Sequence, residues 1–214
     1  MISANTNVWY NDCLALERAM RVAEIIREKA LVRNVAVAAG IFFVSLTLGT
    51  FFGRNIAEEL MGLLGGILGP STPAAGVSIL LFLGIFVNNA IKTLALVFSG
   101  ILLGIPSALF IGLNGFIVGG FCAVLEAANG WTYIVASFLP HGIIEIPVVL
   151  LATALGLVLG MESFKWLLRK ESRVKSRSSD YLRVYVRLIL PGLAIAAIIE
   201  AFVTPLVIGL VNGG

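Results

Sequence analysis

Long uncharged runs alternate with short charged segments along the chain, and this pattern predicts most of the secondary structure. Twenty uncharged, mostly apolar residues separate Arg33 from Arg54, and further charge-free runs cover 60–91, 93–125 and 146–161. A helix rising 1.5 Å per residue needs about twenty apolar residues to cross about 30 Å of hydrocarbon. The pattern therefore predicts transmembrane helices near 34–53, 77–102, 109–128, 140–160 and 187–208.

The segment before the first apolar run has an amphipathic helical pattern. Over residues 6–32, apolar side chains recur at three- and four-residue spacing, and charged side chains occupy much of the rest. We expect residues 1–33 to be cytosolic, with a helix lying in the membrane interface and its basic side chains near lipid headgroups. A helix that binds a partner protein is the alternative. Residues 34–214 are expected to form the transmembrane helical domain.

Two apolar segments contain residues that interrupt a spanning helix. Segment 60–76 is broken by Gly and Pro, so we expect an interfacial or re-entrant stretch there. Residues 129–139 are expected to behave in the same way, with Trp131 and Tyr133 at headgroup depth. The following span is expected to open at Pro140, because the missing N–H of a proline costs nothing at a helix start.

Composition indicates that the bilayer is the solvent of this chain. Hydrophobic residues make up 59% of the 214 positions and charged residues 13%, and the mean hydropathy is +1.01. A soluble domain carries about a quarter charged residues. A chain of 22.7 kDa is too small to bury so much apolar surface inside itself. The predicted fold class is an all-α polytopic bundle of about five spans.

The distribution of Lys and Arg predicts the orientation. Thirteen of the fifteen basic residues lie in 18–33 and 165–187, with Arg54 and Lys92 as the exceptions. Cytoplasmic segments carry the excess of basic residues, so both segments are expected inside a plasma membrane. The N-terminus is then cytoplasmic and the C-terminus extracytoplasmic. The run at 165–177 also suits nucleic acid, but no aromatic platform or reading motif accompanies it, so no nucleic-acid partner is expected.

Small residues recur four apart in most of the apolar segments. In lipid, helices associate through close backbone contact, which small residues permit. We expect most of these pairs to pack within the chain, and a homodimer through at least one such face is the alternative. The pairs are Gly49/Gly53, Gly62/Gly66, Gly65/Gly69, Gly100/Gly104, Gly115/Gly119 and Gly156/Gly160.

Ionisable residues inside spans are costly and mark functional positions, so their depths matter. Four are expected in the outer half of the membrane: Glu126, His141, Glu145 and Glu200. Counting from the expected span start places Glu145 about 7–8 Å below Pro140. His141 and Glu145 are four residues apart and share one helix face.

A second polar set is expected in the inner half. Asn88 and Lys92 share one face of the span at 77–102, and Asn89 is adjacent to them. Asn114 enters from the cytoplasmic end of the next span and is expected at a similar depth. The long side chain of Lys92 can reach the headgroups.

The outer set allows four interpretations. His141 and Glu145, with a second carboxylate, suit a metal ion. Buried carboxylates also suit a proton or ion relay. His141 as a base would suit a membrane hydrolase. The fourth is a hydrogen-bonded lock between helices. No HExxH, GxSxG, Walker or CxxC pattern is present, so we expect a protein that is not an enzyme and has no cofactor.

One stretch is similar to a known family signature. It runs Phe-Leu-Pro-His-Gly-Ile-Ile-Glu-Ile-Pro over 138–147, with Phe-Val-Asn-Asn at 86–89 and Asn-Gly-Phe at 114–116 upstream, and Gly100 and Gly104 between them. Together these resemble the stage II sporulation protein M family over roughly residues 35–160 and, more loosely, over the expected span at 187–208. The matching positions nominate five residues as family-type positions: Asn88, Asn89, Asn114, His141 and Glu145.

The resemblance implies an integral membrane protein of about five spans with no established enzymatic activity. In spore-forming bacteria the family member works with a lytic transglycosylase and an amidase/endopeptidase in peptidoglycan remodelling, and is thought to recruit or scaffold them. The first hypothesis is therefore a non-catalytic scaffold or anchor of a membrane complex, with membrane or extracytoplasmic protein partners and a homo-oligomeric state, a dimer being favoured. The alternatives are a small transporter or channel for an ion or small solute, which would use the intramembrane His, Glu and Asn residues, and intramembrane hydrolysis.

Overall fold

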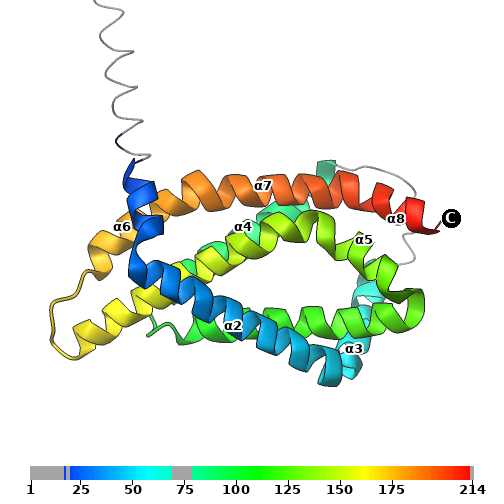
Figure 1. The fold of residues 1–214 in the computed structure, drawn as a ribbon, viewed down its shortest axis with the longest axis horizontal. Helices are drawn as coiled ribbons and strands as arrows, with labels where there is room; N and C mark the ends of the chain where they lie inside the picture. The colour runs from blue at the N-terminus through cyan, green and yellow to red at the C-terminus, as the bar shows by residue number, and fades with distance from the viewer. Residues whose placement is uncertain (1–16, 18–19, 69–78, 213–214) are drawn as a thin grey trace, which may run out of the picture.

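The computed structural model describes residues 17, 20–68 and 79–212, and helices account for almost all of them. This confirms the all-α class predicted from the sequence. Outside the named elements, residues 20–27 are also helical. The named elements are α2 (Lys29–Phe52), α3 (Arg54–Leu68), α4 (Ile79–Ser99), α5 (Ile105–Leu167), α6 (Val174–Val184), η1 (Tyr185–Ile189), α7 (Leu190–Ile198), η2 (Ile199–Val203) and α8 (Thr204–Asn212) (Figure 1).

Element α5 is two antiparallel legs rather than one rod. Its 63 residues would measure about 95 Å if straight, several times the thickness of a hydrocarbon core. At Gly130 the backbone leaves the helical region (φ 79°, ψ 173°), and the chain turns back on itself (Figure 1). We call residues 105–129 the first leg and 131–167 the second leg. Helix α2, helix α4 and the continuous C-terminal helical segment from α6 to α8, which we call the C-terminal rod, are also long and apolar enough to cross a membrane. Together with the two legs of α5 they make about five spans.

The two expected interruptions differ from the observed ones. Residues 131–139 are helical and continuous with the second leg, so they form no separate interfacial stretch, and Pro140 lies inside a helix instead of opening one. Gly130, which has a positive φ, makes the turn between the two legs. Segment 60–76 is helical as far as Leu68, as the end of α3, and its remainder lies outside the described residues.

The first spanning helix also begins earlier in the chain than the sequence predicted. Most of the expected amphipathic helix, over 6–32, lies outside the described residues, but residues 20–27 are helical. Glu28 is extended (φ −61°, ψ 124°), and α2 begins at Lys29. The last residues of the expected amphipathic helix therefore belong to the first spanning helix, which begins before Asn34.

Glycines let two pairs of segments touch backbone to backbone. Along α2 and the first leg, a Cβ on Gly49 would overlap the carbonyl of Phe116, and one on Gly119 would meet the backbone N of Thr50 at 2.8 Å. The turn between α4 and α5 sits on the second leg in the same manner, through Gly100 against Gly156 and Gly104 against Gly160. Four of the six small-residue pairs are thus used inside the chain, as the packing interpretation expects.

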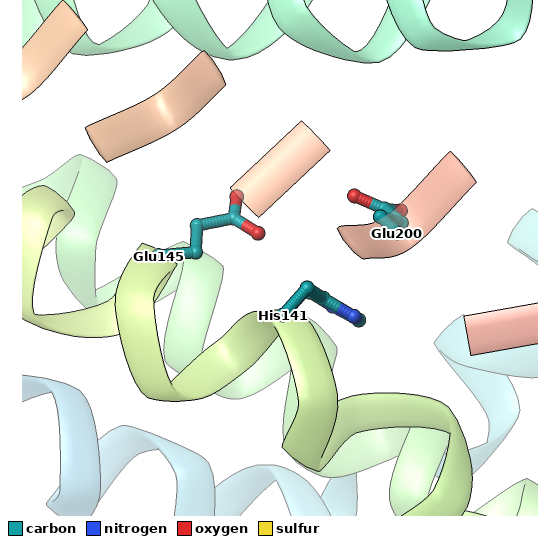
Figure 2. A group of neighbouring side chains, drawn as sticks. All are labelled: His141, Glu145 and Glu200. Carbon is teal, nitrogen blue, oxygen red and sulfur yellow. The ribbon is translucent and has the colours of Figure 1, made fainter. Parts of the chain in front are cut away.

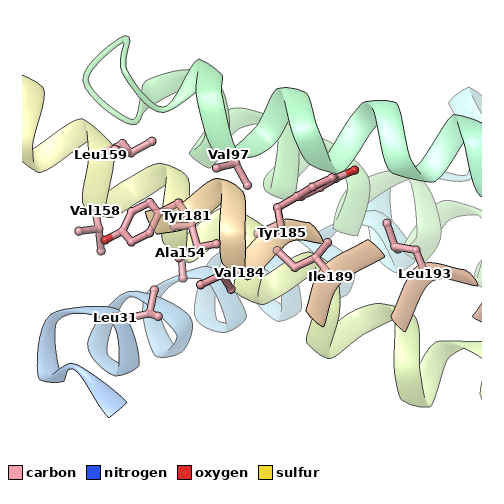
Figure 3. Close-up of a cluster of buried hydrophobic side chains, with 12 residues drawn as sticks. Leu31, Val97, Ala154, Val158, Leu159, Tyr181, Val184, Tyr185, Ile189 and Leu193 are labelled. Atoms are coloured by element: carbon pink, nitrogen blue, oxygen red, sulfur yellow. The ribbon is translucent and has the colours of Figure 1, made fainter. Parts of the chain in front are cut away.

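The buried apolar core gathers where the C-terminal rod crosses the second leg. Tyr181 is 1% exposed, and it packs with Leu31 of α2 and Leu155 and Leu159 of the second leg (Figure 3). Tyr185 donates a hydrogen bond to the carbonyl of Ala90 at 2.6 Å, which ties the rod to α4. Large apolar side chains elsewhere on these helices face outward, as lipid-facing side chains do.

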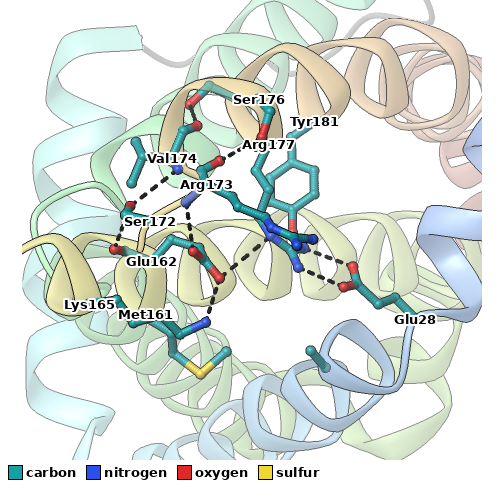
Figure 4. A network of polar contacts seen from close by, with 12 residues as sticks. Glu28, Met161, Glu162, Lys165, Ser172, Arg173, Val174, Ser176, Arg177 and Tyr181 are labelled. Atoms are coloured by element: carbon teal, nitrogen blue, oxygen red, sulfur yellow. Dashed lines mark hydrogen bonds and ion pairs between the residues drawn. The ribbon is translucent and has the colours of Figure 1, made fainter. Parts of the chain in front are cut away.

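An ion-pair network closes one end of the bundle. Arg177 of α6 donates two hydrogen bonds to the Glu28 carboxylate, at 2.6 and 2.8 Å, and one to the Tyr181 hydroxyl at 2.8 Å (Figure 4). Glu162, at the end of the second leg, is 4% exposed and accepts hydrogen bonds from Lys165 at 2.8 Å and from the Arg173 backbone at 2.9 Å. The basic run at 165–177 therefore holds three chain segments together.

Candidate functional site

Polar side chains lie near the middle of several helices, where a spanning helix is deepest in the membrane. Asn88 and Asn89 are central in α4. From residue 131 to Glu145 the second leg rises about 21 Å, so Glu145 is also far from either end. Burying such groups is costly unless they meet each other or water. Their common position therefore points to a shared site.

These side chains line one cavity of about 540 Å³. Its walls come from α2, α4, both legs of α5 and η2, with Phe42 and Phe138 among the apolar lining. The volume is far larger than one water molecule requires, so the cavity has room for a small ligand with water. The polar and ionisable lining residues are Asn88, Asn89, Lys92, Asn114, His141, Glu145 and Glu200.

The expected separation into an inner and an outer polar set is wrong. Asn89 of the expected inner set donates a hydrogen bond from Nδ2 to Glu145 Oε1, in the expected outer set, at 2.9 Å. The error came from the assumed span start at Pro140. Because the helix begins at residue 131, Glu145 lies at mid-helix and meets the centre of α4. Glu126 is exposed and is not among the residues that line the cavity.

His141, Glu145 and Glu200 form the most concentrated group in the cavity. One ligand atom from each lies within 4.8 Å of the other two, and all three side chains are half-buried. Figure 2 shows His141 and Glu145 rising from the second leg toward Glu200 on the C-terminal rod. His141 and Glu145 share a face because they are four residues apart on one helix. The imidazole also lies beside the Phe138 ring, with centroids 6.4 Å apart.

A π-helical turn carries Glu200. Residues 199–203 form η2, and Pro205 follows directly after Thr204. A proline inside a helix removes one backbone donor and crowds the carbonyl four residues earlier, and a wider turn relieves that crowding. The Thr204 hydroxyl donates to the Ile199 carbonyl at 3.3 Å across this turn. The turn itself was not predicted, although a proline within an apolar helical run is its sequence signal.

The arrangement suits binding of a cation or a small polar solute. One imidazole and two carboxylates offer nitrogen and oxygen ligand atoms for a metal. Within the described part of the chain, His141 Nδ1 is buried without a hydrogen-bond partner. Amides from Asn88, Asn89 and Asn114 add donors and acceptors to the same cavity. Lys92, which lines the same cavity, contributes a positive charge. The cavity thus has mixed charge and several hydrogen-bonding groups, surrounded by apolar helices.

Comparison with known proteins identifies one family. The family model described as stage II sporulation protein M matches residues 34–205, which include every lining residue of the cavity. No curated protein and no solved structure matches the chain. The match confirms the resemblance seen in the sequence, and it takes in Glu200.

Proposed function

Because this chain belongs to the stage II sporulation protein M family of membrane proteins, we propose that it is a non-enzymatic family member that binds an ion or small polar solute in its central cavity and passes it across the membrane. One observation carries the proposal. Seven polar or ionisable side chains, from α4, both legs of α5 and η2, line a single cavity at mid-helix. A bundle held together only by packing needs no such cavity.

Two of the helices around the cavity depart from a regular α-helix. Pro140 and Pro147 lie inside the second leg of α5, and the π-helical turn η2 interrupts the C-terminal rod. Discontinuous helices free backbone groups at membrane depth, where they serve binding sites and allow one part of a bundle to move against another. These features support a path through the cavity rather than a sealed core.

The proposed setting is the plasma membrane, with the N-terminus in the cytoplasm and the C-terminus outside. The basic residues at 18–33 and 165–187 support it, since both segments then lie on the cytoplasmic side. The ion-pair network of Glu28, Glu162 and Arg177 is cytoplasmic in this orientation, and α3 follows the first span on the outer side.

A scaffold role is the second candidate, and the exposed surface of α3 favours it. Glu58 and Glu59 are exposed there beside the apolar Ile56 and Leu63, which are 49% and 63% exposed. Among the described residues, a Cβ on Gly62 would meet no other atom within 4 Å, which leaves room for close approach by a partner. A membrane or extracytoplasmic protein, or a second copy of this chain, would dock through α3. Crosslinking in native membranes that recovers only monomers would count against this role.

Flux through proteoliposomes tests the transport proposal. Full-length protein is reconstituted with dyes for protons, sodium, potassium and divalent cations, and wild type is expected to raise the flux of at least one of them. Glu145→Gln should lower that flux about tenfold or more, because it removes a charge from the cavity. Glu126→Gln is the matched control, since it changes an exposed carboxylate of the same helix outside the cavity. No protein-dependent flux, or flux that Glu145→Gln leaves unchanged, would contradict the proposal.

A further inference from the structure

The geometry points to a divalent transition-metal ion as the ligand of the His141–Glu145–Glu200 group, an assignment that rests on the proposed function and names its substrate class. The group combines one imidazole with two carboxylates, with ligand atoms that all lie within 4.8 Å of one another. Calcium and magnesium favour sites made of oxygen alone, whereas an imidazole suits zinc, iron, nickel and copper. The donor set therefore selects transition metals.

The distances between the ligand atoms of His141, Glu145 and Glu200 are close to those that a bound ion requires. Zinc lies about 2.1 Å from nitrogen or oxygen ligands, so two ligands of a tetrahedral ion are about 3.4 Å apart. Side-chain rotations that bring each ligand atom inward by about an ångström would close the site. His141 and Glu145 approach from one helix face, and Glu200 approaches from the facing rod (Figure 2). Three protein ligands leave a fourth position open to the cavity.

A second, independent observation is the state of the imidazole. His141 Nδ1 is buried and has no hydrogen-bond partner among the residues that the structure describes. A buried ring nitrogen without a partner is unusual in a folded protein and calls for an explanation. A metal bond to Nδ1 would give this nitrogen the partner that it lacks.

Neighbouring groups are arranged as supports for such a site. Asn89 donates its amide to Glu145 Oε1, which orients the carboxylate and leaves Oε2 available as a ligand. Lys92 lines the same cavity, and its positive charge is opposite in sign to the charges of the two carboxylates. An arriving cation must therefore compete with the Lys92 ammonium. This competition favours reversible binding, as a transported ion requires.

Zinc binding to the full-length, tag-free protein in lipid nanodiscs tests the inference. After chelator treatment, equilibrium dialysis and elemental analysis are expected to find one Zn²⁺ per wild-type chain. His141→Ala and Glu200→Gln should weaken binding about tenfold or more, while Glu126→Gln binds as wild type does. Lys92→Met should tighten binding several-fold, because it removes a competing charge, and a gain of affinity is not explained by misfolding.

Cobalt provides a spectroscopic check on the ligands. Co²⁺ in place of zinc should give visible absorption bands that are lost in His141→Ala. Absence of stoichiometric zinc, or zinc that His141→Ala does not affect, would overturn the inference. Flux of another solute without zinc binding would overturn it and leave the transport proposal standing. Zinc binding with no flux of any probe would support the inference and contradict transport.

Discussion

The Arg177 guanidinium joins three parts of the chain that lie far apart in sequence. It makes paired hydrogen bonds to Glu28, before α2, and its Nε lies 3.7 Å from Glu162 at the end of the second leg. A planar guanidinium matches a carboxylate in this two-point manner, which lysine cannot do. Replacing Arg177 by Met would leave the buried Glu162 with Lys165 and the Arg173 amide alone. The expected loss is about 2 kcal/mol of stability.

The ion pair between Arg177 and Glu28 predicts that the stability of the protein depends on pH. Hydrogen bonds from Arg177 hold the pKa of the Glu28 carboxyl below its ordinary value, against the opposing effect of burial. The folded state thus favours ionised Glu28. The contribution of this carboxylate to the free energy of unfolding is complete at neutral pH and is lost as the pH falls through the acid range. Glu28→Gln should lower stability at pH 7 by about 1 kcal/mol, since the carboxylate is partly exposed.

Melting temperatures in detergent measured from pH 7 to pH 4 check this prediction. The gap between wild type and Glu28→Gln should shrink as the pH falls. Glu24→Gln is the control, because Glu24 is an exposed residue of the preceding helical segment. A gap of constant size over this pH range would show that the ionised carboxylate is not what Arg177 stabilises.

The close contact between α2 and the first leg of α5, called the glycine seam below, depends on glycine residues. A methyl group on Gly119 would collide with the carbonyl of Leu46 and lie 2.8 Å from the backbone N of Thr50. Backbone atoms cannot move aside as a flexible side chain can. Gly119→Ala should therefore lower stability by about 2–3 kcal/mol. Gly40→Ala, on α2, adds a methyl that meets no atom within 4 Å among the described residues, and it should leave stability unchanged or slightly higher. Equal effects of the two substitutions on the melting temperature would contradict this packing.

The π-helical turn η2 is predicted to aim Glu200 at the cavity. Pro205→Ala restores the missing backbone donor and allows an ordinary α-helical turn, which should rotate Glu200 away. Flux and zinc binding should fall about tenfold while the melting temperature stays the same or rises. Pro191→Ala, after η1, is the matched control, since Pro191 does not line the cavity. A lower melting temperature with unchanged zinc binding would give η2 a purely structural role.

The sequence predicted the spanning elements better than their ends. Charge spacing located every long apolar helix, because a charge inside hydrocarbon is costly whatever the neighbours are. Pro140 was misplaced because proline suits a helix start, yet neighbouring helices also tolerate it inside a membrane helix. That error moved Glu145 toward the surface and separated it from Asn89. The residues of the site were all identified, but their meeting depends on helix ends and crossings, which periodicity does not record.

The whole molecule is firmly joined around a polar interior. The ion-pair network holds one end, the glycine seam joins α2 to the first leg, and Tyr185 links the rod to α4. Between these contacts lies the cavity of about 540 Å³. These contacts keep ligands from separate helices in register, as a binding site requires.

The orientation of the whole protein in the membrane is also a prediction. With the basic segments inside, the C-terminus is expected outside the cell. A C-terminal alkaline phosphatase fusion should be active and a C-terminal green fluorescent protein fusion dark. Fusions placed in the loop between α5 and α6, after Lys170, should give the opposite result. Activity of the phosphatase at the loop position would reverse the proposed orientation.

Cysteine accessibility shows whether the polar cavity inside the bundle is open to water. Asn114 lines the cavity, whereas its neighbour Leu113 is 61% exposed and faces outward, toward lipid in the proposed arrangement. In a background with Cys13→Ser and Cys122→Ser, Asn114→Cys should react with a small charged methanethiosulfonate reagent, and Leu113→Cys should not. Equal reactivity at the two positions, or an inert Asn114→Cys beside a reactive Leu113→Cys, would contradict the account.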